Sequence, residues 1–407
     1  MLSSCYAGPM SCGYNCVMSD FAIHFNQLTT VLARHQSDWQ RLPFTCRALP
    51  WPELTPVLEH LTEAELDALE ASPEQSLSLL APYRPDLTLL QAMPVADLNR
   101  APDYATPRWS SGIPGRKWAQ IRDFAANISA VYPILEWCAG KGHLGRLLAM
   151  EQQQPVTSLE WDPGLCHQGE ALAGKLNLEH EFHCGDALAA DTAALFARQQ
   201  QAVALHACGE LHLRFLKHGA AAGTQALALS PCCYHLIDGQ YYSPLSAAGQ
   251  QQDLRLSRHD LRLPLQQQVT GGERVRRLRH TELTWRLAFD ELQRELTGCD
   301  RYLPLPAFPK QLLSGDFSAF AHWACERKGL TAPAVIDSDR WLMQAGQRRL
   351  LIKRIELVRH LYRYPLELWL LLDRVLFLEE QGYRVTLGTF TDLTNTPRRY
   401  LIQAHRH

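Results

Sequence analysis

The sequence predicts an α/β fold in which an open, mostly parallel sheet binds a ligand along one edge. The first observation is a short apolar strand, Ile134 to Cys138, that leads into a glycine turn and a helix. The second is that four further apolar segments follow, separated by helical patterns. The third is that each segment ends in small or polar residues. Ligands bind at the carboxyl ends of the strands in such sheets, so these residues should meet at one edge.

The turn after the first strand reads Ala139-Gly140-Lys141-Gly142. Glycine is needed there because a Cβ atom would block the approach of the backbone to a ligand, and the next helix supplies free N–H groups. The spacing resembles a dinucleotide-binding fingerprint. An acidic residue precedes it, however, and a carboxylate suits a cationic amino-acid cofactor better than a pyrophosphate. The predicted cofactor contacts are Glu136, Cys138, Ala139, Gly140, Lys141 and Gly142.

The next two strands add acidic residues to this edge. Glu160 ends the second strand, 156–160, where a carboxylate commonly holds a ribose diol, and Asp162 is the second candidate. Asp186 follows the third strand, where it can accept a hydrogen bond from an adenine amino group. A helix over 116–130 precedes the first strand, and Lys117 near its start is either a cation close to the cofactor or a surface lysine.

The last two strands of this region end in sulfur and imidazole groups. The fourth strand, 202–206, ends at His206 and is followed by Ala-Cys-Gly209. The fifth strand, 226–230, runs into Pro231-Cys-Cys-Tyr-His235. Five strand ends of this composition together strongly favour cofactor binding. Late in the chain, a helix over 365–381 and strands over 383–391 and 399–404 suit a sixth and a seventh strand, the seventh antiparallel.

The fold class predicted is therefore a Rossmann-like, seven-stranded sheet with an N-terminal helical domain and a helical insertion. A linker rich in Pro and Gly, 101–115, separates the N-terminal helices from the sheet region. The predicted parts are a disordered tail (1–17), an N-terminal helical accessory domain (18–105), the first part of the core (106–235), a mostly helical basic insertion (236–345) and the closing part of the core (346–407).

Composition is that of a globular protein, with 46% hydrophobic and 20% charged residues and a net charge of −2. The longest apolar run, 366–378, is interrupted by Glu367, Asp373 and Arg374, so no membrane span is expected. The N-terminal residues contain neither the basic segment nor the apolar segment that a secretory signal requires. We expect the twelve cysteines to be reduced and the protein to be cytoplasmic.

Three ordered motifs carry a family resemblance: Cys138-Ala-Gly-Lys-Gly-His-Leu144, His206-Ala-Cys-Gly209 and Ser230-Pro-Cys-Cys-Tyr-His235. They resemble the S-adenosylmethionine-dependent methyltransferases, and within them the methyltransferase-like group that includes tRNA 2′-O-methyltransferases of the thirteenth Trm type and the glutathione S-transferase C-terminal domain-containing proteins. Lys117 and Thr396-Pro-Arg398 match more loosely. The resemblance implies S-adenosylmethionine as cofactor and RNA as an acceptor. The finger elements of the tRNA enzymes are absent.

The fifth-strand motif offers several chemistries. His235 or Tyr234 could act as a general base for a hydroxyl acceptor, worth about 10²–10⁴-fold, with His206 across the cleft. Tyr234 could equally stack on an acceptor base or pack in the core. Cys232 or Cys233 could attack a pyrimidine ring, or join Cys208 and His235 around zinc. Small buried residues lining the cofactor edge are the favoured interpretation, and no metal is expected.

The insertion is rich in arginine. Such a cluster can cradle RNA phosphates, or it can form a solvated surface that pairs with the acidic N-terminal helices. We slightly favour RNA; the alternatives are methylation of protein or a small molecule, or a cofactor-binding adaptor without activity. The basic residues are Arg255, Arg258, Arg262, Arg274, Arg276, Arg277, Arg279 and Arg286, followed by Arg348, Arg349, Lys353, Arg354, Arg359 and Arg363.

Overall fold

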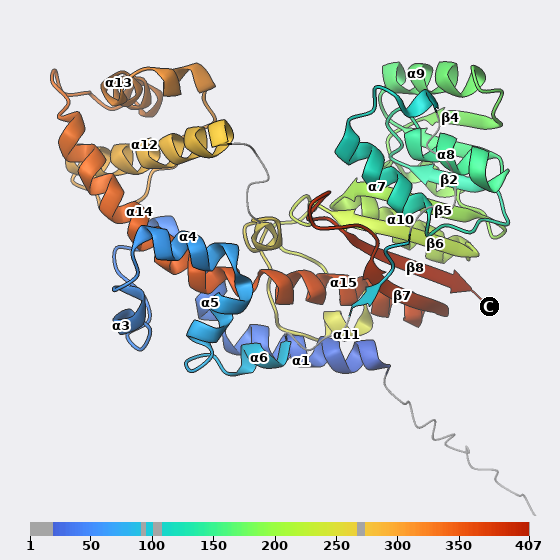
Figure 1. Ribbon diagram of the computed structural model, residues 1–407, viewed down its shortest axis with the longest axis horizontal. Coiled ribbons are helices and arrows are strands. Elements are labelled where there is room, and N and C mark those ends of the chain that lie inside the picture. The colour runs from blue at the N-terminus through green and yellow to red at the C-terminus, as the bar shows by residue number, and fades with distance from the viewer. Residues whose placement is uncertain (1–18, 91–94, 101–107, 267–272, 407) are drawn as a thin grey trace, which may run out of the picture.

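The computed structural model describes residues 19–90, 95–100, 108–266 and 273–406, so the tail predicted over 1–17 lies outside the described residues. Figure 1 shows a sheet with helices on both faces, a lobe built from α12, α13 and α14, and N-terminal helices beside the lower half of α14. In the part of the chain that is described, no helix is both long and apolar enough to span a membrane.

The sheet has the order β1-β7-β8-β6-β5-β2-β3-β4. The pairs β2–β3, β2–β5, β3–β4 and β5–β6 are parallel, whereas β8 runs antiparallel to both β6 and β7. The Rossmann-like prediction and its antiparallel last strand are therefore confirmed, with one strand more than expected. The strands are β1 (Ala96–Asp97), β2 (Ile134–Trp137), β3 (Val156–Glu160), β4 (His180–Cys184), β5 (Gln201–Cys208), β6 (Ala226–Cys232), β7 (Tyr383–Thr389) and β8 (Tyr400–Arg406).

The extra strand comes from the region assigned to the N-terminal domain. Ala96 and Asp97 pair in parallel with β7 at the edge of the sheet, opposite Gly388 and Thr389. Two exposed residues give too short an apolar pattern for a sequence-based prediction. Gly388 permits this pairing, because a Cβ atom there would lie 2.5 Å from the carbonyl oxygen of Ala96.

Both faces of the sheet are buried, as is usual for parallel strands. Successive strand residues alternate between two apolar cores: Ile134 and Val203 join one, whereas Leu135 and Ala202 join the other. Helices α7 and α8 cover the first face, and α10, α15 and α1 cover the second. Around the sheet the helices are α7 (Gly115–Ala125), α8 (His143–Gln152), α9 (Pro163–Gly174), α10 (Glu210–Ala222) and α15 (Arg363–Glu380).

The first helix of the chain belongs to the core of the sheet region. Phe25 of α1 stacks on Trp369 of α15 with ring centroids 5.0 Å apart. The indole N–H of Trp369 also donates to the Thr29 hydroxyl at 2.8 Å. Of the other N-terminal helices, α2 and α4 contact α14, whereas α6 contacts α1. The N-terminal helices are α1 (Asp20–Arg34), α2 (Gln36–Trp39), α3 (Thr55–Leu58), α4 (Glu63–Ala71), α5 (Pro73–Leu80) and α6 (Asp86–Leu90).

The inserted region divides into two structures. Residues 273–337 form a helical lobe with its own apolar core, in which α12 (Glu273–Thr297) and α13 (Phe317–Lys328) pack against α14 (Ser338–His360). The boundary expected between 345 and 346 falls inside α14, which runs unbroken from the lobe to the N-terminal helices (Figure 1). Residues 236–266 contain little helix beyond α11 (Ala247–Gln250) and short turns, and they pack against α15.

A buried carboxylate fixes residues 236–266 on α15. Asp373 is fully buried and accepts hydrogen bonds from the Tyr242 hydroxyl at 2.5 Å and from the Leu245 N–H at 2.9 Å. It also accepts from the backbone N–H and the hydroxyl of Ser246. The carboxylate thus receives four donors from one loop, which replaces the hydration that burial removes.

We expect Asp373→Asn to lower the free energy of unfolding by about 2–4 kcal/mol, because an amide leaves part of this donor set without an acceptor. Urea unfolding and the melting temperature measure the loss. The matched control is Asp253→Asn, an exposed residue of the same segment, which should behave like wild type. Equal stability of the two variants would contradict the role given to Asp373.

Candidate functional site

The carboxyl edge of the sheet holds three non-glycine residues in the left-handed backbone region. Cys138, His206 and Cys233 have φ angles of 58°, 66° and 47°. They lie just after β2, in a bulge near the end of β5, and just after β6, which are neighbouring strands. Each such conformation costs about 1–3 kcal/mol and is typical of functional sites, where it points a side chain in a direction that a regular strand does not allow.

A cavity of about 270 Å³ lies on one side of the glycine turn, at the ends of β3 and β4. Glu160 and Asp186 both line it, and their contacts to a ribose and an adenine stay predictions. The Glu160 carboxylate accepts from the Gly140 N–H at 2.8 Å and from the Asp162 N–H at 3.1 Å, so it is held at the cavity wall. The lining residues are Cys138, Leu159, Glu160, Trp161, Gly185, Asp186, Ala187 and Leu211.

A second, larger cavity of about 530 Å³ lies on the other side of the same turn, beneath α7. Its lining is basic: Lys117, Lys141, Arg146 and Lys175 all contribute, and Gly140 faces it. A Cβ atom added at Gly140 would meet no atom within 4 Å, so the turn leaves open space beside its backbone. Cations around an open turn suit the carboxylate of an amino-acid cofactor.

Glu136 lies beneath the turn rather than in either cavity lining. Its carboxylate accepts from the Ser158 hydroxyl at 2.7 Å, and the Gly145 N–H also donates to it. Burial raises the pKa of Glu136 to about 7. The Ser158 oxygen also meets His180 Nε2 at 2.7 Å. Glu136 thus supports the turn from below, and a direct contact between its carboxylate and the cofactor stays a prediction.

His206 and Lys117 approach the edge from the α7 side. The His206 Nε2 atom is hydrogen-bonded to the Gln120 side chain on α7. Burial, with Arg398 nearby, lowers the pKa of His206 to about 4, so the ring is neutral at pH 7. Lys117 lies one turn before Gln120, is exposed, and lines the basic cavity. No sequence pattern marks Gln120, because its partner His206 is 86 residues away.

The fifth-strand motif separates into buried and accessible residues. Tyr234 is 1% exposed and donates its hydroxyl to Glu367 at 3.1 Å, so it connects β6 to α15. Burial raises the pKa of the Tyr234 phenol well above its usual range, which disfavours it as a base in this conformation. His235 is only partly buried, and its Nδ1 atom has no hydrogen-bond partner in the described parts of the chain. Burial, with Arg262 close by, lowers the pKa of His235.

The cysteines of the motif meet Cys208 of the neighbouring strand. Cys208 and Cys232 are register partners in β5 and β6, and their sulfur atoms lie 3.2 Å apart. Cys233 turns toward them, and the three sulfur atoms all lie within 4.8 Å of one another. Hydrogen bonds from Cys208 and Cys232 lower the pKa of Cys233, whereas those same contacts raise the pKa of Cys232. Cys232 is 4% exposed, which shields it from an acceptor ring.

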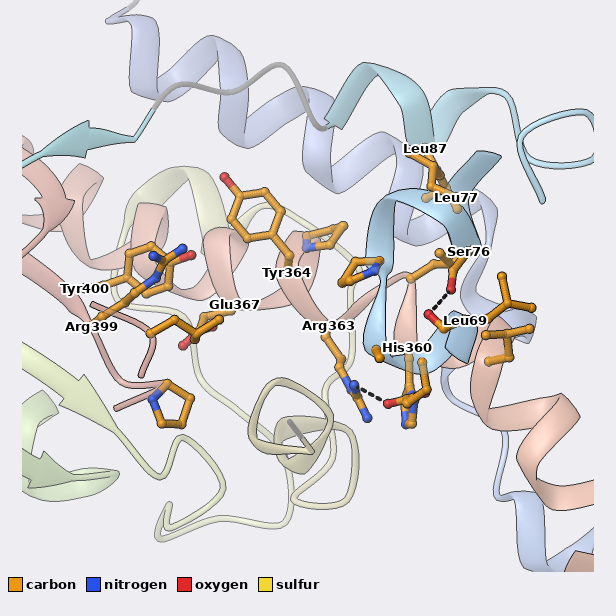
Figure 2. A pocket seen from close by; sticks show the side chains of 18 residues that line it. Leu69, Ser76, Leu77, Leu87, His360, Arg363, Tyr364, Glu367, Arg399 and Tyr400 are labelled. Atoms are coloured by element: carbon orange, nitrogen blue, oxygen red, sulfur yellow. Dashed lines mark hydrogen bonds and ion pairs between the residues drawn. The ribbon is translucent and has the colours of Figure 1, made fainter. Parts of the chain in front are cut away.

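A further pocket of about 450 Å³ lies beyond β8, between the sheet and the N-terminal helices (Figure 2). Arg399 and Tyr400 from the start of β8 form one side, and Leu69 and Leu77 of α4 and α5 lie opposite (Figure 2). Glu367, the acceptor of the Tyr234 hydroxyl, lies in its wall and connects it to the fifth-strand motif. This pocket could not be predicted from the sequence, because Leu69 and Arg399 on its opposite sides are 330 positions apart by their numbers.

Comparison with known families agrees with this geometry. Residues 116–240 match a family described as "Methyltransferase domain". No curated protein matches the chain. The matched residues, 116–240, include the glycine turn, both cavity-lining carboxylates and the fifth-strand motif. The chain therefore contains a methyltransferase domain, and its cofactor is S-adenosylmethionine.

Solved structures with a related arrangement are distant. A TehB-like SAM-dependent methyltransferase from Corynebacterium glutamicum is 15% identical, with 27% of this chain and 61% of that chain covered and a TM-score of 0.22. An uncharacterized protein from Listeria monocytogenes is 12% identical, with coverages of 56% and 98% and a TM-score of 0.25. WbdD is 15% identical, with coverages of 37% and 30% and a TM-score of 0.23. The chain thus spans less than two thirds of the first of these proteins, and the assignment rests on the domain match and the site geometry.

We expect Glu160→Gln and Asp186→Asn each to weaken binding of S-adenosylmethionine by about tenfold or more, since a charge-assisted hydrogen bond contributes about 1.5–3 kcal/mol. Isothermal titration calorimetry measures the Kd. Glu181→Gln is the matched control, because Glu181 is an exposed carboxylate of β4 outside the cavity lining. Wild-type affinity in both site variants would remove these carboxylates from the cofactor site.

Proposed function

We propose that the protein transfers a methyl group from S-adenosylmethionine to RNA. We also propose that it is related to the tRNA-modifying and glutathione S-transferase C-terminal domain-containing members of the methyltransferase-like group. The observation that carries the RNA proposal is a set of exposed arginines at the start of α12. Arg274, Arg277 and Arg279 are exposed and have no ion-pair partner within the described residues. Free guanidinium groups of this kind bind phosphates.

The basic residues of α14 differ from the arginines of α12 because acidic side chains pair with them. On α14, Lys353 bonds Glu63 at 2.9 Å and Asp67 at 2.5 Å, and Arg349 also bonds Glu63. Arg363 at the start of α15 bonds Glu70 at 2.7 Å. These cations are neutralised by the N-terminal helices, so they are not free to bind RNA. The alternative interpretation of the arginine-rich region, pairing with acidic helices, thus applies to α14 and not to the start of α12.

Two further arginines, in the chain segment between β6 and α12, could also contact phosphates. Arg262 is exposed and near enough to His235 to lower the pKa of that ring. Arg255 is exposed and lies over the Tyr241 ring, with its guanidinium carbon 4.2 Å from the ring centroid. Arg258, by contrast, donates to the carbonyl oxygens of 237–239 and is occupied. The side chain of Arg276 lies outside the described residues.

The chemistry that follows is direct transfer to an oriented acceptor. The bound cofactor supplies an electrophilic methyl group, and the two cavities beside the glycine turn hold its nucleoside and amino-acid parts. Orientation alone can supply effective molarities of about 10⁵ M or more. His235 is partly exposed at this edge, and its imidazole can take the proton of an acceptor hydroxyl. Tyr234 and Glu367 hold this motif against α15.

The acceptor test is transfer of labelled methyl groups to RNA and, separately, to the protein fraction of cells lacking this gene. We expect label in RNA with wild type and none with Gly140→Arg, whose added side chain would occupy the space beside the turn. A triple variant, Arg274→Gln, Arg277→Gln and Arg279→Gln, should bind RNA more weakly and reduce the slope of log affinity against log salt by about 2–3.

The matched control removes the same charge elsewhere in the lobe, by Arg327→Gln, Lys328→Gln and Arg340→Gln, and should bind RNA like wild type. Label confined to protein, or to small molecules, would replace RNA with one of those acceptors. If the protein binds the cofactor but transfers label to no fraction, it is a cofactor-binding adaptor without activity. An unchanged salt slope in the α12 variant would refute this arginine surface as the phosphate contact.

We expect His235→Ala to lower kcat by about 10²-fold or more while leaving the Kd for S-adenosylmethionine unchanged, because the ring acts on the acceptor and lies outside both cofactor cavities. Single-turnover transfer to RNA measures the rate. Tyr234→Phe is the comparison, since it removes only a buried hydroxyl. A kcat unaffected by loss of the imidazole would end the proposal that His235 is the base.

A further inference from the structure

The cluster of Cys208, Cys232 and Cys233 has no task in cofactor binding or proton transfer. It comes from three positions at the carboxyl edge, of which two are register partners in adjacent strands. Within the described residues these are the groups that bring three possible metal ligands together, with sulfur atoms all within 4.8 Å. We propose that this cluster binds one zinc ion through three thiolates, with the fourth coordination position open toward the acceptor side of the edge.

The spacing of the sulfur atoms suits such an ion. A tetrahedral zinc ion with Zn–S bonds of about 2.3 Å requires sulfur atoms about 3.8 Å apart. The Cys208 and Cys232 sulfurs lie 3.2 Å apart, and no pair in the cluster exceeds 4.8 Å. Small side-chain rotations would therefore bring all three to bonding positions. Thiolate sulfur is the ligand type that selects zinc over magnesium or calcium.

The backbone explains how adjacent cysteines can bind one ion. In a regular strand, successive side chains point to opposite faces, so Cys232 and Cys233 would diverge. Cys233 instead has a φ of 47°, which ends the strand and turns its side chain back toward Cys232. The sequence alone could not reveal this conformation, which brings two neighbouring thiols to one side.

The surroundings suit a three-thiolate ion with one open position. Zinc with three thiolates carries a net charge of −1, which the guanidinium of Arg398, close to Cys208 and Cys233, would offset. Cys208 and Cys233 are partly exposed, whereas Cys232 is buried, so one side of the cluster is accessible. No fourth His, Cys, Asp or Glu ligand atom from the described residues joins the group. Three protein ligands and an accessible fourth position are typical of reactive zinc sites.

The test is metal content and cobalt spectroscopy of the full chain, neither of which depends on the RNA proposal or on methyl transfer. We expect purified wild-type protein to contain one equivalent of zinc by elemental analysis. Protein stripped of metal under reducing conditions should bind Co²⁺ with a sulfur-to-cobalt charge-transfer band and the visible absorption of a tetrahedral ion. Each of Cys208→Ser, Cys232→Ser and Cys233→Ser should weaken Co²⁺ binding by at least tenfold and reduce the charge-transfer band.

Two control variants separate this cluster from the other cysteines. Cys184→Ser removes an exposed thiol, and Cys5→Ser with Cys12→Ser and Cys16→Ser removes the cysteines of the N-terminal segment. Both should retain wild-type zinc content and spectra. A serine variant could fail to fold, so the Co²⁺ spectrum of the wild-type protein tests thiolate coordination without any substitution. Absence of zinc together with absence of a charge-transfer band in reduced wild type would overturn the proposal, as would loss of zinc in the N-terminal triple variant alone.

Discussion

The hydrogen bonds of one buried carboxylate hold the site together. Glu136 in β2 accepts from Ser158 in β3 and from the N–H of Gly145 in α8, so it joins two strands to the helix that follows the turn. A side chain at Gly145 would place a Cβ atom 2.5 Å from the Glu136 carboxylate, which makes glycine obligatory there. The path of the turn, and hence both cavities beside it, depends on this contact.

Two carboxylates at this edge have different surroundings. Glu136 lies within β2 and burial raises its pKa to about 7, whereas Glu160 ends β3 and accepts two backbone N–H groups at the wall of a cavity. The sequence alone does not separate them, because both are acidic residues of largely apolar strands. Their environments differ because Glu136 is covered by α8, whereas Glu160 lies at the end of its strand and lines a cavity.

Much of the sheet could be predicted from the sequence, since strands such as 134–137 and 226–232 are apolar and bounded by glycine or proline. The antiparallel closing strand followed from the same pattern and is confirmed. Contacts between distant segments could not be predicted: α1 packs on α15 through Phe25 and Trp369, which are 344 positions apart by their numbers. Likewise, the convergence of three thiols depends on a backbone angle at Cys233 that no composition reveals.

Helix α14 joins parts of the molecule that the sequence analysis treated as separate. It runs without a break over 23 residues, or about 35 Å, from the α12–α13 lobe to the N-terminal helices. Its last turn contributes Leu357 and His360 to the pocket of Figure 2, and Arg363 and Tyr364 of α15 follow in the same wall. Because α14 is one unbroken helix, the lobe and this pocket wall are built on a single element, so the wall has no flexible joint that separates it from the lobe.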